Sequence, residues 1–260
     1  MKICIVIPAH NEEKRIARTL DEYCGFFSNL KKNKTFDFEI LVVINNTNDR
    51  TESIVRTFQK NCKELRCLNF KQGGKGFAVI EGFKDALKRE NDFIGFVDAD
   101  MSTSPSEFYR ICTRIGQSDG AIASRYLKGS VVRPKPTFSR ILSSRIFNFL
   151  IRALFLMPYQ DTQCGAKIFR REAVKEVLPR LSMSKWAFDV DLLYSLRRLG
   201  FEIKEIPSVW SDTKYSKINF MRAGPWMAIA LVRLRLYNSP FKGVVKIYNR
   251  ITDFVYRRVK

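Results

Sequence analysis

The sequence has very little of the residues that bind zinc or build a secreted disulfide framework. Its 260 residues include one histidine, His10, and six cysteines without a CxxC pair or regular spacing. A zinc site is therefore disfavoured, and the cysteines are expected to be reduced thiols of a cytosolic protein.

Long apolar runs, targeting signals and common nucleotide-binding motifs are also missing. The longest apolar stretch, residues 146–157, is interrupted by Arg152 and is shorter than the roughly 20 residues that span a bilayer. Met1 and Lys2 lead directly into a strand-like segment, so we expect no signal peptide and no integral membrane anchor. Without GxxxxGK[ST] or GxGxxG, a P-loop ATPase and a dinucleotide oxidoreductase are disfavoured.

Acidic residues are scarce relative to basic ones. The chain has 46 Lys and Arg against 26 Asp and Glu, a formal net charge of +20. Residues 125–160 contain no acid, and residues 219–260 contain a single one, Asp253. This excess predicts an anionic partner, which could be nucleic acid, a phosphorylated substrate or an anionic lipid surface.

What the chain does have, over its first half, is a regular alternation of strand-like and helical patterns. Strands are expected at residues 3–7, 38–44, 65–70, 93–97 and 121–124, and helices at 12–30, 49–60, 76–89 and 105–116. This order predicts an α/β fold with a mostly parallel central sheet flanked by helices.

The second half is less regular. Helices are expected at residues 139–157, 171–181, 187–199, 226–236 and 244–259, and short strands at 167–169, 201–206 and 209–210. We expect one catalytic domain over residues 1–218, followed by a basic amphipathic helical tail over 219–260.

Four polar segments follow the first four strands, at the edge where open α/β sheets bind ligands. They are Pro8-Ala9-His10-Asn11-Glu12, residues 45–51 (NNTNDRT), Gly73-Gly74-Lys75-Gly76 and Asp98-Ala99-Asp100. Each segment alone is equally typical of an ordinary turn. Together they predict a nucleotide site, with Asp98 and Asp100 holding a divalent metal (Mg²⁺ or Mn²⁺) through their carboxylates. The alternative is two solvated acids in a turn.

These segments, together with three later strings, resemble the family 2 glycosyltransferases of the GT-A (Rossmann-like) fold. The later strings are Ser124-Arg125-Tyr126, residues 161–167 (DTQCGAK) and residues 186–191 (WAFDVD). More narrowly, the chain resembles dolichyl-phosphate sugar synthases, and the last two strings resemble the glucosyltransferase branch more than the mannosyltransferase branch. The resemblance covers residues 1–218.

The resemblance implies inverting transfer of a hexose from a nucleoside-diphosphate sugar, with UDP-glucose favoured, to dolichyl or polyprenyl phosphate. Its implied nucleotide-sugar contacts are Pro8, Ala9, Asn11, Glu12, Asn45, Lys75, Asp98 and Gln163. The implied catalytic residues are Asp100, Asp189 and Arg125, with Asp189 near the donor sugar and Arg125 on the acceptor phosphate. Asp189 could instead cap a helix.

Arg140 and Ser144, four residues apart on one helical face, are further candidates for the acceptor phosphate. Arg140 could equally be a solvated or headgroup-facing charge. One departure from the family pattern concerns the base: Asn45 stands where many members have an aspartate. Its amide can still hydrogen-bond a base edge but supplies no charge.

A lipid acceptor requires contact with a membrane. Residues 146–157 and the tail combine apolar and cationic side chains, a composition typical of interfacial helices. We expect peripheral attachment at the cytoplasmic face; the alternative is that these segments pack as ordinary core helices. The rival functions are a GDP-mannose-dependent mannosyltransferase, a basic nucleic-acid-binding protein and an inactive relative. Nucleic acid is disfavoured as a partner because the positive charge lies beside apolar runs.

Overall fold

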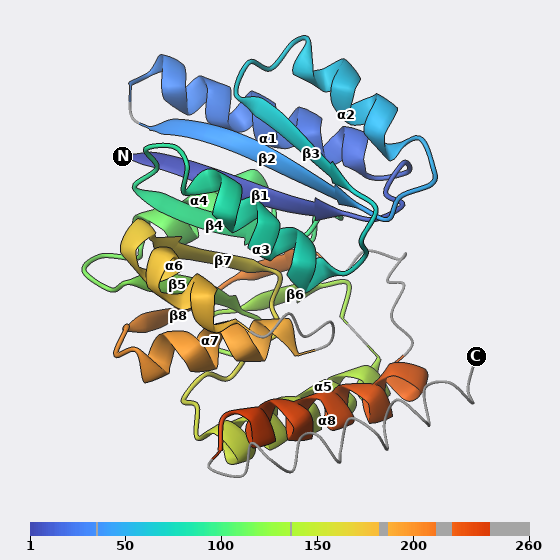
Figure 1. Cartoon of the computed structure of the whole chain (residues 1–260), viewed down its shortest axis with the longest axis vertical. Helices are drawn as coiled ribbons and strands as arrows, with labels where there is room; N and C mark the ends of the chain where they lie inside the picture. Colours follow the sequence, from blue (N-terminus) through green and yellow to red (C-terminus); the bar gives the residue numbers. More distant parts are fainter. Residues whose placement is uncertain (35, 136, 182–186, 212–219, 240–260) are drawn as a thin grey trace.

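A seven-stranded sheet forms the centre of the protein, with the strand order β3-β2-β1-β4-β7-β5-β8 (Figure 1). The computed structural model describes residues 1–34, 36–135, 137–181, 187–211 and 220–239. The strands of this sheet are β1 (Lys2–Ala9), β2 (Asp37–Asn45), β3 (Leu65–Phe70), β4 (Phe93–Val97), β5 (Gly120–Ser124), β7 (Ala166–Arg170) and β8 (Ile203–Pro207). Neighbouring strands are parallel except at β7, which runs antiparallel to both β4 and β5. The predicted mostly parallel sheet is confirmed.

Helices cover both faces of the sheet, as the alternating sequence pattern predicts. One apolar core lies under α1 (Ile16–Lys32), α2 (Thr51–Gln59) and α4 (Pro105–Thr113). The core on the other face lies under α3 (Lys75–Ala86), α6 (Arg171–Val177) and α7 (Phe188–Arg198). Strands buried on both faces need near-continuous apolar runs, and β4 and β5 are buried throughout.

The first helix begins later than the sequence pattern indicates, at Ile16 rather than residue 12. Asn11 has a positive φ of 52°, which interrupts the helical path. The next two backbone N–H groups are used by the β2–α2 loop: Glu12 donates to Thr51 Oγ1 (2.8 Å) and Glu13 to Asp49 Oδ2 (3.1 Å). Residues 11–15 therefore belong to the loops at the sheet edge.

A second, two-stranded sheet lies beside the carboxyl end of β5. It pairs β6 (Val131–Arg133) in parallel with β9 (Val209–Ser211). The sequence pattern misses β6, because three residues beside prolines give no usable alternation. Long-range pairing with β9 defines this strand.

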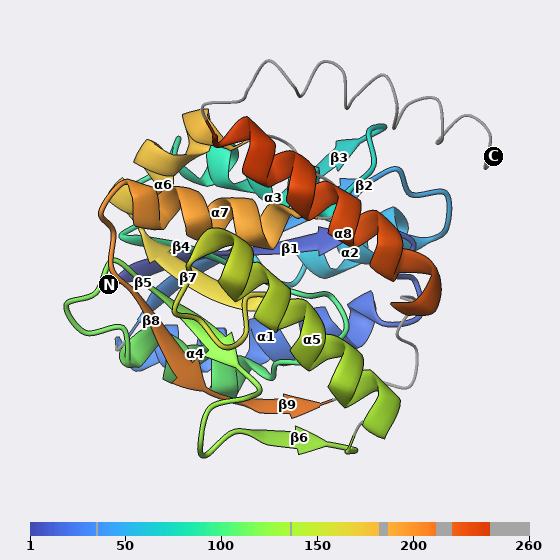
Figure 2. The same cartoon turned by 90° about the horizontal axis from the view of Figure 1, so that it is seen from below.

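The long helices α5 (Phe138–Phe155) and α8 (Phe220–Tyr237) pack side by side below the main sheet (Figures 1 and 2). Phe147, Ile151 and Phe155 of α5 are buried in the same core as Leu231 and Leu234 of α8. The opposite side of α5 exposes large apolar side chains, namely Leu142, Ile146, Phe149, Leu150 and Leu154. One side of α5 therefore packs as a core helix, and the membrane contact expected for residues 146–157 stays a prediction for the exposed side.

None of the helices in the described ranges is long and apolar enough to cross a bilayer. The helix expected at residues 244–259 lies outside the described residues, and so do residues 212–219 around the predicted domain boundary.

Candidate functional site

The loops that follow β1, β2 and β3 are held together by the side chain of Asn45. Its Nδ2 donates to the Ala9 carbonyl (3.0 Å), and its Oδ1 accepts from the Gly74 N–H (2.9 Å). The residue is only 2% exposed. The structure therefore gives Asn45 a bracing role between three loops. Both of its polar atoms are bonded to backbone inside the protein, and the expected contact of this amide with a nucleotide base stays a prediction.

The expected nucleotide-contacting segment of β1 lies directly against the β2–α2 loop. Asn11 Oδ1 accepts from the Asn48 N–H (3.0 Å), and the Asn11 N–H donates to Thr47 Oγ1 (3.3 Å). Pro8 and Ala9 end β1, and Glu12 forms a short ion pair with Arg15 (2.5 Å). The structure thus brings Pro8, Ala9, Asn11 and Glu12 to one edge of the sheet, as the topology predicts.

The two acids after β4 lie at this same edge. Asp98 Oδ1 is 2.7 Å from Lys75 Nζ at the start of α3, and the two side chains are 29% and 35% exposed. Asp100 Oδ1 accepts from the Ser102 N–H (3.0 Å), and Asp100 Oδ2 is 4.0 Å from Arg15 Nη1. Between the acids, Ala99 is buried in the core, which fixes the turn.

Gly165 lies against the Asp98 carboxyl. A Cβ at position 165 would come within 1.8 Å of Asp98 Oδ2, and the Asp98 N–H donates to the Gly165 carbonyl (3.0 Å). Only a residue without a side chain can occupy this position while Asp98 keeps its place.

The surroundings of Asp98 raise the pKa of its carboxyl. Desolvation raises the pKa of its carboxyl, and the charges of Asp100 and Asp189 raise it further, against the opposing effect of Lys75. Desolvation alone would lower the pKa of Lys75, but Asp98 and Asp189 raise it above its ordinary value. The carboxylates of Asp98 and Asp100 offer the oxygen ligands that a divalent cation takes. Within the described residues, no group of three or more His, Cys, Asp or Glu side chains could hold a metal ion together.

Asp189 is paired with a buried lysine of β7. Lys167 is fully buried, and its Nζ lies 2.7 Å from Asp189 Oδ1 and 2.6 Å from the Cys164 carbonyl. Asp189 lies in the first turn of α7. The ion pair with Lys167 therefore fixes the orientation of the Asp189 carboxylate near Asp98.

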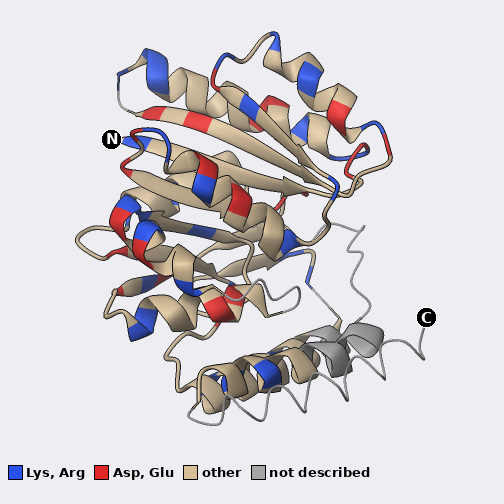
Figure 3. Ribbon diagram, viewed as in Figure 1, with Lys and Arg blue, Asp and Glu red and all other residues tan. Residues whose placement is uncertain are grey.

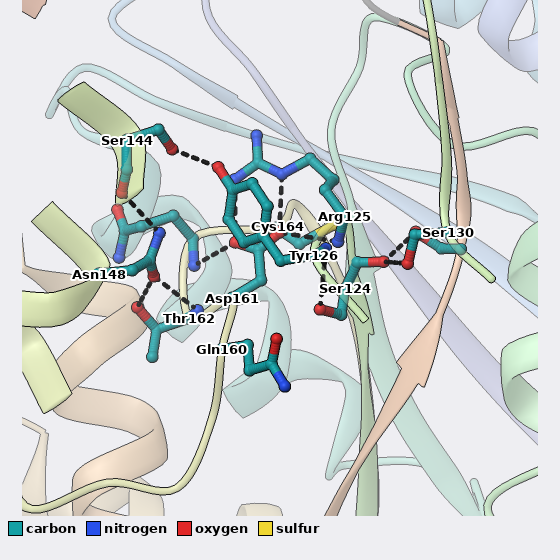
Figure 4. Close-up of polar contacts among 12 residues, drawn as sticks. Ser124, Arg125, Tyr126, Ser130, Ser144, Asn148, Gln160, Asp161, Thr162 and Cys164 are labelled. Atoms are coloured by element: carbon teal, nitrogen blue, oxygen red, sulfur yellow. Dashed lines mark hydrogen bonds and ion pairs between the residues drawn. The ribbon is translucent and has the colours of Figure 1, made fainter. Parts of the chain in front are cut away.

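Arg125 is held by a fully buried carboxylate, Asp161. Arg125 Nε donates to Asp161 Oδ2 (2.7 Å), Nη2 to Oδ1 (2.9 Å) and the backbone N–H to Oδ2 (3.0 Å) (Figure 4). Desolvation would raise the pKa of Asp161, but the charge and N–H groups of Arg125 hold it below its ordinary value. Because Nε and Nη2 form one edge of the guanidinium, Nη1 lies on the edge that faces away from Asp161.

Tyr126 and Ser144 lie beside this pair. Their hydroxyl groups share a hydrogen bond, and the Arg125 guanidinium lies 5.5 Å from the centroid of the Tyr126 ring (Figure 4). The Tyr126 side chain therefore contacts both Ser144 and Arg125. Arg140 lies in the first turn of α5, and its side chain is outside the described part of the structure.

One short segment, residues 161–165, connects the two halves of the site. Asp161 holds Arg125 at one end, and Gly165 packs on Asp98 at the other. Between them, Thr162 donates to Asn148 Oδ1 of α5 from its N–H (3.2 Å) and its hydroxyl (3.3 Å). Within the described residues, the buried Nε2 of Gln163 has no hydrogen-bond partner.

Sequence reasoning missed the supporting residues of the site. The sequence patterns assign no roles to Tyr126, Asp161 and Gly165. A charged residue between apolar segments is a signal for a buried ion pair, but its partner, Arg125, lies 36 positions away along the chain.

The chain is similar in sequence to a protein family and to individual described proteins. A family model described as glycosyl transferase family 2 matches residues 4–178. A dolichyl-phosphate beta-glucosyltransferase from Dictyostelium discoideum is 30% identical over 243 residues, which cover 90% of this chain and 73% of the relative. The Homo sapiens protein with the same description is 29% identical over 229 residues, covering 84% and 69%.

Solved structures share the fold. A glucosyl-3-phosphoglycerate synthase from Mycobacterium tuberculosis, in complex with Mn²⁺, uridine-diphosphate and phosphoglyceric acid, has a TM-score of 0.63 at 18% identity. The match covers 90% of this chain and 78% of that one. A mannosyltransferase from Pyrobaculum calidifontis, in complex with GDP-Man and Mn²⁺, has a TM-score of 0.61 at 16% identity, covering 91% and 63%. The predicted fold class is confirmed.

Proposed function

The chain belongs to glycosyltransferase family 2, and on that premise we propose that it transfers glucose from UDP-glucose to dolichyl or polyprenyl phosphate with inversion at the anomeric carbon. The observation that carries this proposal is the segment 161–165, which joins the carboxylate pair of a donor site to an anchored arginine. The relatives described as dolichyl-phosphate beta-glucosyltransferases support the same donor sugar and acceptor.

In this proposal the donor lies along the carboxyl edge of β1, β2 and β4. The loop of Pro8, Ala9, Asn11 and Glu12 contacts the nucleoside, and Asn45 acts indirectly by keeping that loop in place. The unpartnered Nε2 of Gln163 is a donor for an oxygen of the sugar or diphosphate. Lys75 already neutralises Asp98 and is close enough to meet the diphosphate as well.

Asp98 and Asp100 would hold a divalent metal, Mg²⁺ or Mn²⁺. When bound there, such an ion neutralises charge that develops on the departing diphosphate. Asp189, oriented by Lys167, accepts hydrogen bonds from hydroxyl groups of the glucose.

The acceptor phosphate binds on the other side of the segment, against Nη1 of Arg125 and near Ser144 and Arg140. A phosphomonoester is ionised near neutral pH. One of its oxygens can therefore form the bond to the anomeric carbon without a protein base, while the bond from that carbon to the diphosphate breaks and UDP leaves. Arg125 positions the attacking oxygen and balances its charge.

We place the encounter with the lipid at the exposed apolar side of α5. The helix carries arginines and no acid, and Figure 3 shows basic residues without acidic ones on the coloured part of the α5–α8 pair. This composition suits peripheral binding to a membrane surface. Six free cysteines support the cytoplasmic face, where thiols stay reduced.

The test is transfer of labelled sugar to dolichyl phosphate in detergent with Mn²⁺ or Mg²⁺. We expect labelled lipid from UDP-glucose and none from GDP-mannose, and Asp100→Ala should lower the rate at least about 100-fold. Asp21→Ala, an exposed acid on α1, is the matched control.

If labelled lipid forms only from GDP-mannose, the proposed donor UDP-glucose is wrong and GDP-mannose takes its place. No label from either nucleotide sugar would favour an inactive relative. Tight, salt-sensitive binding to nucleic acid together with no transfer would restore the nucleic-acid interpretation.

A further inference from the structure

A cavity of about 170 Å³ lies next to the acceptor group, on the α5 side of Tyr126. It is lined by Tyr126, Arg145, Asn148, Phe149, Arg152 and Gln160. At about 30 Å³ per water molecule, this volume corresponds to about six waters, which is enough for a tetrahedral phosphate. The cavity shares Tyr126 with the group formed by Arg125, Tyr126 and Ser144, but neither Arg125 nor Ser144 lines it.

Two cationic side chains and no acidic one line this cavity, and Glu205, outside the lining, accepts a hydrogen bond from the backbone N–H of Gln160 (2.9 Å). In the described ranges, Arg145 and Arg152 form no salt bridge, and residues 125–160 contain no acid. The Arg145 guanidinium lies 5.7 Å from the centroid of the Tyr126 ring, which Arg125 also contacts. Two like charges around one cavity are unfavourable alone and are stabilised by an anion between them.

The arrangement on the helix lets both arginines reach one ligand. Positions 145 and 152 are separated by two helical turns, a rise of about 10 Å, on the same side of α5. Long flexible side chains can close this distance onto one phosphate. The Gln160 amide lies at the rim and adds neutral hydrogen-bond donors.

The surroundings of the cavity select an amphiphilic ligand over a soluble one. Phe149, which lines it, is 66% exposed, and Ile146 and Leu150 beside it are 51% and 42% exposed. An anion in the cavity would have an apolar rim next to it, where acyl chains or the apolar part of a bilayer can lie.

We propose that this cavity is a second anion site, which takes the phosphate headgroup of an anionic bilayer phospholipid between Arg145 and Arg152. The proposal rests on the proposed apposition of α5 to a membrane and is independent of sugar transfer. A phospholipid bound in this cavity places Arg125, Tyr126 and Ser144 next to the bilayer surface, where the phosphate of a lipid acceptor lies.

The test measures binding of the full chain to vesicles of phosphatidylcholine, with and without phosphatidylglycerol. No nucleotide sugar or acceptor lipid is present, so a failure of the proposed transfer does not affect the result. The double variant Arg145→Gln/Arg152→Gln should bind anionic vesicles about 25-fold more weakly, from about 1 kcal/mol per arginine. Gln160→Glu, which places a negative charge at the rim, should weaken binding in the same direction.

The matched control is Arg233→Gln/Arg235→Gln, which removes two exposed charges from the neighbouring helix α8. It should weaken binding less than about 3-fold. Equal losses in the two double variants would mean diffuse attraction and would overturn the site. Thermal unfolding of each variant identifies any loss that comes from misfolding, and Gln160→Glu then decides the outcome.

A separate arm distinguishes lipid from free phosphate. Inorganic phosphate and glycerol 3-phosphate are titrated into the wild-type protein already bound to anionic vesicles, at constant ionic strength. We expect neither to release it. Release by either anion, with no binding of that anion to the Arg145→Gln/Arg152→Gln variant, would assign the cavity to a soluble anion and overturn the lipid assignment.

Discussion

A single methyl group at Gly165 tests whether Asp98 has to stand where the structure places it. In Gly165→Ala the new Cβ would lie 1.8 Å from Asp98 Oδ2 and 2.3 Å from its Cγ, whereas real Cβ contacts are essentially never under 3.0 Å. The carboxyl therefore has to move by more than about 1 Å, a displacement that can cost about 100-fold in rate. The same movement breaks the 2.7 Å contact with Lys75.

We expect Gly165→Ala to lower metal-dependent glucosyl transfer at least about 100-fold, which is about 2.7 kcal/mol on the barrier. Gly25→Ala on α1 is the matched control, since nothing lies within 4 Å of its added Cβ. It should leave transfer unchanged and raise the free energy of unfolding by about 0.5–1 kcal/mol.

The assay measures transfer from UDP-glucose as a function of Mn²⁺ concentration, together with cooperative unfolding of each variant. If Gly165→Ala folds and keeps its transfer rate within about 3-fold of wild type, Asp98 does not need this position, and the role assigned to it is wrong.

Three further variants probe the supporting contacts. Asp161→Asn leaves Arg125 without its buried counter-charge and should lower the free energy of unfolding by about 3–5 kcal/mol in denaturant titrations. The pKa of Asp161 is lowered in the folded state. Its carboxylate therefore adds to the free energy of unfolding above the ordinary carboxyl pKa, and this contribution is lost as the pH falls through the folded-state pKa. The difference in the free energy of unfolding between wild type and Asp161→Asn should therefore shrink in acid. A difference that stays constant with pH would contradict the ion pair between Arg125 and Asp161. Asn45→Ala removes the partners of Ala9 and Gly74, and should cost about 1–3 kcal/mol and raise the KM for UDP-glucose; an unchanged KM would mean that the loops keep their place without it. Ser104→Ala removes the cap of α4, which accepts from Glu107 N–H (3.2 Å), and should cost about 1 kcal/mol in thermal unfolding with no change in transfer.

Much of the fold could be predicted because its elements are locally encoded. The strands β3 and β4 have the bounds that the apolar runs give, and most helix ends differ by a few residues. The differences have tertiary causes. The first helix starts late because Glu12 and Glu13 donate to the loop after β2, and β6 exists only through its pairing with β9.

The candidate site divides in the same way. Asp98, Asp100 and Lys75 could be predicted to meet because each follows a strand or opens a helix at one sheet edge. The position of Asn45 at the end of β2 could likewise be predicted from the sequence, but the orientation of its side chain could not. An amide beside a ligand edge and an amide that braces loops have the same sequence pattern, and only the positions of Ala9 and Gly74 distinguish them.

The sequence by itself determined the α/β alternation, the family and the set of chemical groups at the sheet edge, because periodicity and short motifs are properties of neighbouring residues. The tertiary structure alone decided which groups are partners. It pairs Arg125 with Asp161 and Asp189 with Lys167, presses Gly165 onto Asp98, and separates the buried side of α5 from the exposed one. These relations join residues far apart in the chain, and the packing of the antiparallel strand β7 and its preceding segment between the two halves of the site brings them into contact.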